Sequence, residues 1–402
     1  MKIVDVRATP VYVAMEAPLR WSMGVETGTV RTIIELQTDE GLVGIGETYG
    51  GSSIVRAIEE AKPFFVGLDP FEVQTLVKRF EVFRITSEQM ARMAELKNVG
   101  AGIEIACWDL IGKALEKPLY ALWGGADRKE IEFIAHIFYR YSEGEKGGES
   151  SPAAIVERYA ELSERHGFRG VKFKGGVFHP DEELATLRAL REAYGDAIRW
   201  LRFDPNQAWS PPLAITTLRK MRDLDLEYVE DPTWDLEGMA RVRRSIPEIV
   251  LATNQAVVGM ADIPPAVRMD ALDTILVDLY FWGGPSAAKK VASICEVFGL
   301  GLAIHSDREL GIGTAAGLHF VASTPQVCHA YDSHYHDQTD DVITEPITFR
   351  DGFATVPEGP GLGVELDPDA LDRCARAYEQ YGERVEFFDT RRPQWTPHLP
   401  VF

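Results

Sequence analysis

The hydrophobic and polar positions of the second half of the chain follow a regular pattern. Short apolar runs each end at a polar residue, and these polar residues recur at intervals of 24 to 30 positions. They are Lys174, Asp204, Glu230, Asn254, Asp278 and His305. A short β-strand, a loop and a helix occupy about that much chain, and parallel strands need such a crossover. The pattern predicts repeated βα units with polar residues at the carboxyl ends of the strands, as in the catalytic mouth of a (β/α) barrel.

The segments between these strands have the periodicity of helices. Residues 181–194 place Leu184, Leu187 and Leu190 on one stripe, and residues 285–298 form a similar apolar stripe. The strands themselves are short and apolar on both faces, as buried parallel strands are. We therefore expect an α/β barrel domain over residues 126–345.

The first 125 residues have a different pattern. A strand meander with a turn at residues 39–41 is followed by a helical stretch that Gly124 and Gly125 end. The repeated strand–helix pattern of the barrel also stops after residue 345, where a series of turns leads the chain away from the barrel. We expect residues 1–125 to form an α+β capping domain, and residues 346–402 to return to that domain and complete it.

Three of the strand-end residues offer oxygen ligands. Asp204, Glu230 and Asn254 would lie on three successive strands, with no histidine or cysteine among them. Such a set suits a hard divalent cation, Mg²⁺ before Zn²⁺. Taken singly, Asp-Pro and Glu-Asp-Pro are common turn formers after strands. Their occurrence in three successive βα units favours a metal site.

The remaining strand-end residues suit acid–base chemistry. Lys172 and Lys174 are two positions apart on one strand, so both point to one face. Two ammonium groups beside a cation disfavour each other's protonation, so we expect a lysine pKa lowered toward that of a general base. The alternative is an exposed strand end with snorkelling lysines. On the far side, an aspartate bonded to one imidazole nitrogen would make Asp278 and His305 a second acid–base pair.

Composition narrows the range of partners. The chain has 42 Lys and Arg residues against 62 Asp and Glu, a net charge of −20, which would repel nucleic acid and anionic membranes. An acidic small molecule would need a local cation. The four cysteines have no C-x-x-C spacing, and the N-terminus lacks the apolar core of a signal peptide. We expect a cytoplasmic protein that binds neither nucleic acid nor membrane.

Several motifs resemble those of a known family. The set VKFK, DPNQAW, VEDP, ATNQ and IHS, followed by DSH and PEGPGLGVELD, is similar to the enolase superfamily of the mandelate racemase and muconate lactonizing enzyme type. Within it, the set resembles the acid-sugar dehydratase branch and the glucarate dehydratase family. The similarity covers almost the whole chain. It implies an α/β fold: a modified (β/α)₇β barrel with an α+β capping domain built from both termini.

The resemblance also implies a chemistry. Mg²⁺ would be held by the three oxygen ligands, Lys172 would be electrophilic, Lys174 a base, and His305 with Asp278 a second base and acid. The implied activity removes the proton α to a carboxylate and eliminates the β-hydroxyl, giving a 2-keto-3-deoxy sugar acid. The implied partner is a small sugar acid, and we expect a homo-oligomer. The alternatives are a racemase or epimerase on the same scaffold and a non-catalytic sugar-acid binder.

The candidate substrate-binding residues are Glu26, His136, Asn206, Ser306, Asp307 and His334. Here the chain departs from the glucarate dehydratase pattern. Glu26 and Asp307 stand where that family has a His and an Asn, and no Arg matches the family's near the C-terminus. Carboxylates repel a second substrate carboxylate in a water-poor site. We therefore expect a substrate whose far end is a hydroxyl, an aldonate-like acid, or an aldarate that binds weakly.

Overall fold

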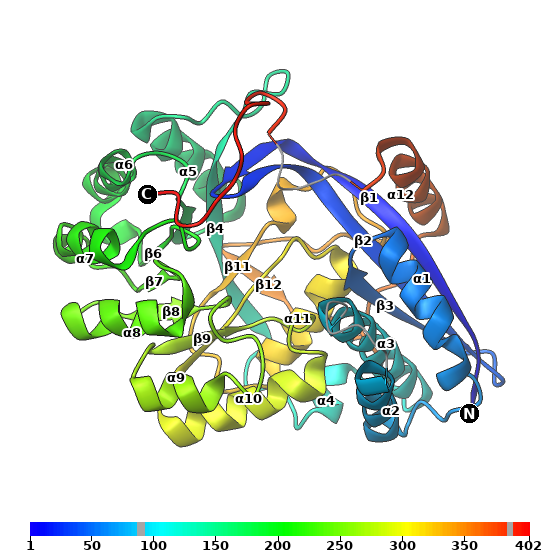
Figure 1. The fold of residues 1–402 in the computed structure, drawn as a ribbon. Coiled ribbons are helices and arrows are strands. Elements are labelled where there is room, and N and C mark those ends of the chain that lie inside the picture. Colours follow the sequence, from blue (N-terminus) through cyan, green and yellow to red (C-terminus); the bar gives the residue numbers. More distant parts are fainter. Residues whose placement is uncertain (87–92, 384–388) are drawn as a thin grey trace.

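The computed structural model describes residues 1–86, 93–383 and 389–402 (Figure 1). The chain begins with an antiparallel meander of three strands, β1 (Ile3–Trp21), β2 (Gly24–Thr38) and β3 (Val43–Tyr49). Residues 39–42 form the tight turn between β2 and β3. Gly41 adopts a φ of 83° there, in a region that suits glycine better than other residues.

Helices cover one face of this meander (Figure 1). They are α1 (Ser52–Ala61), α2 (Val73–Thr86), α3 (Met93–Ala114) and the short α4 (Leu119–Leu122). Helix α3 packs directly on β3. This close packing depends on Gly44 and Gly46, because a Cβ atom at either would collide with a backbone oxygen of α3, that of Ala106 or of Gly102.

Within the described residues, eight parallel strands form the barrel. They are β4 (Glu130–Arg140), β5 (Gly170–Lys174), β6 (Trp200–Asp204), β7 (Tyr228–Glu230), β8 (Leu251–Thr253), β9 (Thr274–Val277), β10 (Gly301–Ile304) and β11 (Tyr331–Ser333). Each strand from β4 to β9 pairs in parallel with the next, and β11 pairs in parallel with β4. A parallel bridge between Leu302 and Val327 joins β10 to the segment that leads into β11.

A helix follows each barrel strand except the last in the described chain. These helices are α5 (Pro152–His166), α6 (Pro180–Tyr194), α7 (Pro211–Arg219), α8 (Asp235–Ser245), α9 (Ile263–Met269), α10 (Pro285–Phe298) and α11 (Gly311–Ala322). The order is therefore seven strand–helix units followed by a strand. The predicted fold class, an α/β (β/α)₇β barrel with an α+β capping domain, is confirmed.

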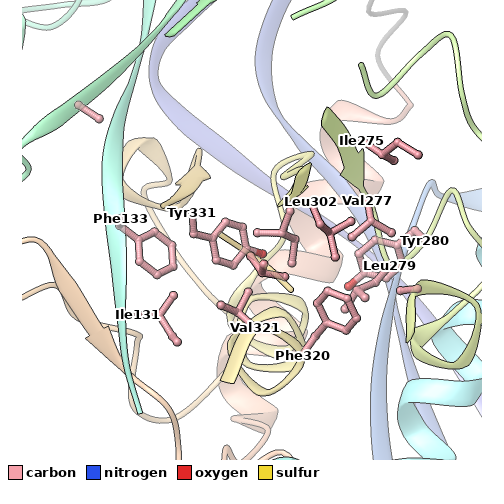
Figure 2. Packing of buried hydrophobic residues seen from close by; sticks show 14 of the residues in the cluster. Ile131, Phe133, Ile275, Val277, Leu279, Tyr280, Leu302, Phe320, Val321 and Tyr331 are labelled. Atoms are coloured by element: carbon pink, nitrogen blue, oxygen red, sulfur yellow. The ribbon is translucent and has the colours of Figure 1, made fainter. Parts of the chain in front are cut away.

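The hydrophobic core continues from the barrel strands to α11 (Figure 2). Phe133 of β4 stacks on Tyr331 of β11 with ring centroids 4.7 Å apart. Phe320 and Val321 of α11 pack into the same cluster. Every residue of α11 is buried, since this helix lies between the barrel and strand β3 of the capping sheet. A helix without a solvent face needs no polar stripe, and α11 has none.

The C-terminal segment touches both parts of the molecule. Helix α12 (Pro368–Tyr381) packs against β1, whereas β12 (Phe353–Thr355) pairs antiparallel with β4. The amides of Val401 and Phe402 donate to the Ala208 carbonyl in the loop after β6, at 2.8 and 3.0 Å. The domain boundaries at residues 125 and 345 stay predictions. None of the described helices combines the length and apolar character needed to cross a membrane.

Candidate active site

A cavity of about 500 Å³ opens at the carboxyl ends of the barrel strands. Its lining combines barrel residues with side chains of the capping sheet, including Trp21, Met23 and Glu26 from the region between β1 and β2. Leu399 of the C-terminal segment adds to the wall. The barrel alone would leave this cavity open, so the capping strands and the C-terminus complete it.

The structure brings the predicted site residues together. The cavity is lined by Glu26, His136, Lys174, Asn206, Asn254, His305, Ser306, Asp307 and His334. The other predicted residues, Lys172, Asp204, Glu230 and Asp278, are buried next to this group and contact its members. Lys172 reaches the group through its ion pair with Glu230.

Asp204 and Lys174 are linked at the ends of β6 and β5. Lys174 Nζ donates to Asp204 Oδ2 at 2.6 Å and to Asn206 Oδ1 at 2.7 Å. Asn206 in turn donates to Ser22 Oγ at 2.9 Å, across to the capping domain. Asn206 also has a φ of 52°, a conformation that is uncommon outside glycine and that often accompanies functional sites. The ammonium of Lys174 is thus positioned from both domains.

Lys172 is surrounded by carboxylates. Its Nζ lies 2.7 Å from Glu230 Oε2, 3.4 Å from Asp332 Oδ2 and 3.9 Å from Asp204 Oδ2. Burial lowers the pKa of Lys172, but the charges of Asp332, Glu230 and Asp204 outweigh burial and raise the pKa well above 10.5. The prediction of a lowered pKa is therefore wrong for Lys172, since nearby carboxylates dominate over the neighbouring lysine. A permanent ammonium suits an electrophilic role.

The predicted metal ligands carry unbalanced negative charge. The pKa of Glu230 is raised to about 7, because burial disfavours its charged form and Asp204 and Asp332 repel it, which Lys172 only partly offsets. The amide of Asn254 lies 3.2 Å from Glu230 Oε1. A divalent cation between these oxygens would relieve the repulsion. Two buried carboxylates and an amide oxygen fit Mg²⁺ by their chemistry.

The third ligand predicted for the metal site is the side-chain amide of Asn254. In the described part of the chain, no cluster of three or more His, Cys, Asp or Glu side chains is arranged to hold a metal ion. Asp204 and Glu230 supply only two such ligands. The side-chain oxygen of Asn254 would be the third protein ligand of the predicted site, with water and substrate completing the coordination.

Asp278 and His305 form the expected pair. His305 Nδ1 lies 3.1 Å from Asp278 Oδ2, while Asp278 Oδ1 accepts from the amides of Tyr280 and Phe281 at 2.6 and 2.9 Å. Burial lowers the pKa of His305, but the hydrogen bond and charge of Asp278 raise it to about 9. His305 Nε2 lies 2.9 Å from the Asn254 amide. The geometry provides a protonated imidazole beside the proposed metal ligands.

Arg308 is a site residue that the sequence reasoning missed. Its Nη1 lies 3.1 Å from Glu26 Oε2 and its Nη2 lies 3.2 Å from Asp307 Oδ1. Arg308 therefore lies between the two carboxylates that the sequence places at the far end of the substrate. The available signal was an arginine two residues after the predicted Ser306 and next to Asp307. In the structure Arg308 adopts a left-handed conformation with a φ of 63°.

Two histidines form the wall between β4 and β11. The rings of His136 and His334 have centroids 4.4 Å apart, and both line the cavity. Burial, helped by nearby positive charge, holds the pKa of each well below 6.5. Among the described residues, neither ring nitrogen of His136 has a hydrogen-bond partner, nor has Nδ1 of His334. Both side chains can therefore offer neutral donor and acceptor atoms to a ligand.

Asp332 was also missed, although it lies in the DSH motif. Its carboxylate lies between Lys172 and Arg202, 3.4 and 3.5 Å from their nitrogens. Gln255 was missed as well, and its amide donates to Asn206 Oδ1 at 2.9 Å. Gln255 directly follows Asn254 in sequence, and Asp332 lies two residues before His334. Asp332 holds Lys172 and Gln255 holds Asn206. These contacts join residues that are distant in sequence, and the pattern of apolar and polar positions does not predict them.

Comparison with known proteins agrees with this architecture. The family model described as enolase C-terminal domain-like matches residues 154–370. The model of the mandelate racemase / muconate lactonizing enzyme N-terminal domain matches residues 3–124. The chain is 36% identical over 399 residues to the protein named probable glucarate dehydratase of Streptomyces coelicolor, which covers 92% of this chain and 90% of that protein.

Other relatives carry out different reactions by name. The hydrophobic dipeptide epimerase of Enterococcus faecalis is 29% identical over 380 residues, covering 90% of this chain and 99% of the epimerase. Among solved structures, an enolase of Pseudomonas fluorescens with bound magnesium, potassium and tartrate is 30% identical. It superposes with a TM-score of 0.93 over 100% of this chain and 99% of that chain.

Proposed function

Because the chain belongs to the enolase superfamily, with a mandelate racemase / muconate lactonizing enzyme N-terminal domain, we propose that it is an Mg²⁺-dependent acid-sugar dehydratase. The reaction removes the proton α to a carboxylate and expels the β-hydroxyl as water. The product is a 2-keto-3-deoxy sugar acid. The relative named probable glucarate dehydratase supports this reaction over others in the superfamily.

One observation carries the proposal. Lys174, from β5, and His305, from the end of β10, line the same cavity, and each contacts a proposed metal ligand. A substrate carboxylate beside those ligands would bring its α-carbon within reach of either base. Proton removal next to a carboxylate needs a positioned base and stabilisation of the developing charge, and this arrangement can supply both.

Four side chains take part in the first step, the removal of the α-proton. Lys174 or His305 takes the α-proton, according to the configuration at carbon-2, and Asp278 keeps the His305 ring oriented through its 3.1 Å contact. The ammonium of Lys172 donates to the carboxylate oxygen on which negative charge accumulates. A bound Mg²⁺ supplies further neutralisation of that charge.

The second step requires an acid. The bond between carbon-3 and its hydroxyl oxygen breaks as the protonated His305 gives its proton to that oxygen, and water leaves. Its raised pKa favours the protonated form of His305 at neutral pH, which suits this acid role when Lys174 has taken the α-proton. For the opposite configuration at carbon-2, the neutral imidazole takes the α-proton and then gives it to the leaving hydroxyl. The resulting enol of the product then takes a proton at carbon-3 and becomes the 2-keto acid, so one water is lost for each substrate consumed.

The far end of the cavity favours a hydroxyl on the substrate. Glu26, Asp307 and Arg308 together carry one net negative charge, and Arg308 is already paired with both carboxylates. A second substrate carboxylate would meet this excess negative charge, whereas hydroxyl groups can donate to the carboxylate oxygens. We propose an aldonate as the substrate class, with the neutral imidazoles of His136 and His334 contacting its hydroxyls.

An epimerase is the second candidate. The observation that favours it is the same pair of bases, since removal of a proton by one and its return by the other inverts carbon-2 without loss of water. The Enterococcus faecalis relative, named a dipeptide epimerase, shows that the superfamily includes such reactions. The two candidates differ in product, a 2-keto acid or an inverted substrate.

The test is a panel of aldonic and aldaric acids incubated with the protein and Mg²⁺ in D₂O. We expect a 2-keto-3-deoxy acid from at least one aldonate. Lys174→Ala and His305→Asn are each expected to lose deuterium exchange of one carbon-2 epimer while keeping part of the other. Lys220→Ala, which removes an exposed lysine paired with Asp181, is the matched control.

Three outcomes contradict parts of the proposal. An inverted substrate without keto acid identifies an epimerase. Binding of the acids with no exchange at carbon-2 identifies a non-catalytic binder. Loss of both epimers' exchange in Lys174→Ala, with His305→Asn unimpaired, excludes the two-base geometry.

A further inference from the structure

One buried arginine of the capping sheet lies outside the cavity. Arg20 lies near the end of β1, which pairs with β4 at this point through Arg20 and Tyr139. Its neighbour Trp21 lines the cavity, and because successive side chains of a strand point to opposite faces, Arg20 points away from it. Arg20 takes no part in the proposed dehydration, so its role does not depend on that reaction.

The other buried arginines of the described chain each form an ion pair. Their guanidinium nitrogens lie 2.6 to 3.1 Å from carboxylate oxygens, in the pairs Arg31–Glu47, Arg140–Glu149, Arg158–Asp337, Arg202–Glu227 and Arg308–Glu26. Arg20 is 7% exposed, yet within the described residues no carboxylate forms an ion pair with it, and its Nε has no hydrogen-bond partner. Arginine keeps its proton in proteins, so this charge is buried without a counter-ion.

Two aromatic rings stabilise the guanidinium of Arg20 in part. Its Cζ lies 4.6 Å from the ring centroid of Tyr141 and 4.7 Å from that of Phe178. Stacking on a ring uses the face of a guanidinium and leaves the N–H groups at its edge without acceptors. Burial lowers the pKa of Arg20 below its ordinary value, and the charge of Arg392 adds to this effect. The edge of the guanidinium therefore favours an anionic acceptor.

The C-terminal segment brings two more arginines to the same place. Arg391 Cζ lies 4.5 Å from the ring centroid of Tyr141, and the Tyr141 hydroxyl donates to Asp389 Oδ2 at 2.8 Å. Arg392 Nε donates to the same carboxylate oxygen at 2.6 Å. Asp389 is 1% exposed and is thus engaged by Tyr141 and Arg392. The Nη groups of Arg392 take no part in this contact, so they can bond another acceptor.

Arg391 is held differently from the other two arginines. Its Nη2 donates to the Ser142 carbonyl at 2.7 Å and lies 4.0 Å from Glu143 Oε2. Its charge therefore has a carboxylate nearby. Arg20 and Arg392 are the members of this group with N–H donors to offer a ligand.

We propose that Arg20 and Arg392 bind a phosphate group between β1 and the C-terminal segment, beside the rings of Tyr141 and Phe178. A guanidinium can donate two parallel hydrogen bonds to phosphate oxygens. A phosphate has oxygens on several sides and carries close to two negative charges at neutral pH, so it can bond both arginines at once. A carboxylate has its oxygens in one plane and a single charge, which suits one guanidinium.

A phosphate bound there would join the capping sheet to the segment that completes the cavity wall. Leu399 of that segment lines the cavity, as does Trp21, which directly follows Arg20. Binding would therefore stabilise the wall that Trp21 and Leu399 form, as well as the folded protein as a whole.

The experiment measures thermal unfolding and calorimetric binding of the full-length protein in sodium phosphate, with sodium chloride of equal ionic strength as the reference. Arg20→Met removes the buried charge. Arg7→Met is the matched control on β1, because the Arg7 side chain is 63% exposed. Phosphate that binds in the cavity stabilises all three proteins alike, since both substitutions leave the cavity residues in place. The difference between the proteins therefore reports on Arg20.

We expect phosphate at ten times its dissociation constant to raise the unfolding midpoint of the unmodified protein and of Arg7→Met by about 2 °C more than that of Arg20→Met. Glycerol 3-phosphate with the same effect would support a site for phosphate monoesters. An effect of inorganic phosphate alone would support a site for the free ion.

An equal rise in the unmodified protein and in Arg20→Met would overturn the proposal, because Arg20 would then bind no phosphate. An equal rise with sodium acetate would also overturn it, since any small anion would then serve. Arg392→Gln decides the matter if Arg20→Met does not fold, because it leaves β1 unchanged. Its dissociation constant for phosphate should be at least about five-fold higher than that of the unmodified protein, and an unchanged constant would contradict the site.

Discussion

At the scale of single residues, the site depends on balancing buried charges. Lys172 pairs with Glu230 and Lys174 with Asp204, yet burial and the charges of Asp204 and Asp332 still raise the pKa of Glu230 to about 7. Removal of one carboxylate weakens both cation binding and the charge stabilisation that the cation supplies. These two carboxylates are therefore the residues on which the metal interpretation is tested most directly.

We predict that Asp204→Asn and Glu230→Gln each lower turnover by at least about a thousand-fold and abolish Mg²⁺ binding. Titration calorimetry measures Mg²⁺ binding independently of activity. Asp181→Asn, which changes an exposed carboxylate on α6, is the control and should behave like the unmodified protein. Full turnover in excess chelator would contradict the metal assignment.

A second residue-scale prediction concerns specificity. Asp307→Asn removes the excess negative charge at the far end of the cavity, while Arg308 keeps its contact with Glu26. The ratio of kcat/KM for an aldarate to that for the matching aldonate should rise about ten-fold, because one unit charge a few ångströms away is worth about that much. Asp307→Glu keeps the charge and is the control. A preference of the unmodified protein for D-glucarate over every monocarboxylate sugar acid would refute the substrate class.

At the scale of elements, one buried carboxylate ties the capping sheet to the barrel. Glu47 of β3 accepts from the amides of Leu310 and Gly313 at the start of α11, each at 2.8 Å, and pairs with Arg31 of β2 at 2.9 Å. Arg31 also approaches Glu309 at 3.6 Å. The loop that carries His305 and Arg308 leads directly into α11. Its position is therefore set by the capping domain as well as by β10.

We predict that Glu47→Ala lowers the free energy of unfolding by about 3 kcal/mol, because Arg31 would be left buried with weaker compensation and two amides would lose their acceptor. Urea denaturation measures this loss. Glu157→Ala, an exposed change on α5, should stay within about 0.5 kcal/mol of the unmodified protein. If Glu47→Ala loses no more unfolding free energy than Glu157→Ala does, the contacts of Glu47 contribute nothing to stability.

At the scale of the whole molecule, the charged residues inside the barrel make stability depend on pH. The pKa of Glu227 is lowered to about 2: burial opposes this, but Arg202 and His329 outweigh it. Its stabilisation is complete above about 4.5 and is lost as the pH falls through about 2. The pKa of His329 is raised to about 9, so its stabilisation is complete below about 6.5 and is lost as the pH rises through about 9.

We predict that the unfolding free energies of the unmodified protein and of His329→Asn differ most between pH 5 and pH 6. The difference should shrink by on the order of 2 kcal/mol between pH 6.5 and pH 9. Denaturation curves at several pH values measure this. Cys328→Ser leaves the pair of His329 and Glu227 in place. The unfolding free energy of this variant should therefore keep part of its dependence on pH. Parallel stability curves for the unmodified protein and His329→Asn would contradict the assignment of the raised pKa.

The sequence by itself determined the barrel and the residues at its mouth. A βα unit needs a fairly constant length of chain, so its spacing is visible in the pattern of apolar runs. The carboxyl ends of parallel strands must meet at one end of the barrel, so Asp204, Glu230, Asn254 and His305 could be grouped without knowing any distance. The motif resemblance then assigned expected roles, which stay predictions until the variants are measured.

Only the tertiary structure decided how the charges of the site are balanced. Arg308 lies between Asp307, its neighbour in the chain, and Glu26, which comes from the start of the distant strand β2. Asp332 comes to Lys172 from the far side of β4 and reverses the expected direction of the lysine's pKa shift. Coulomb interactions in a buried site depend on separations of a few ångströms. Those separations arise from the closure of the barrel and the docking of the cap, which no local stretch of sequence specifies.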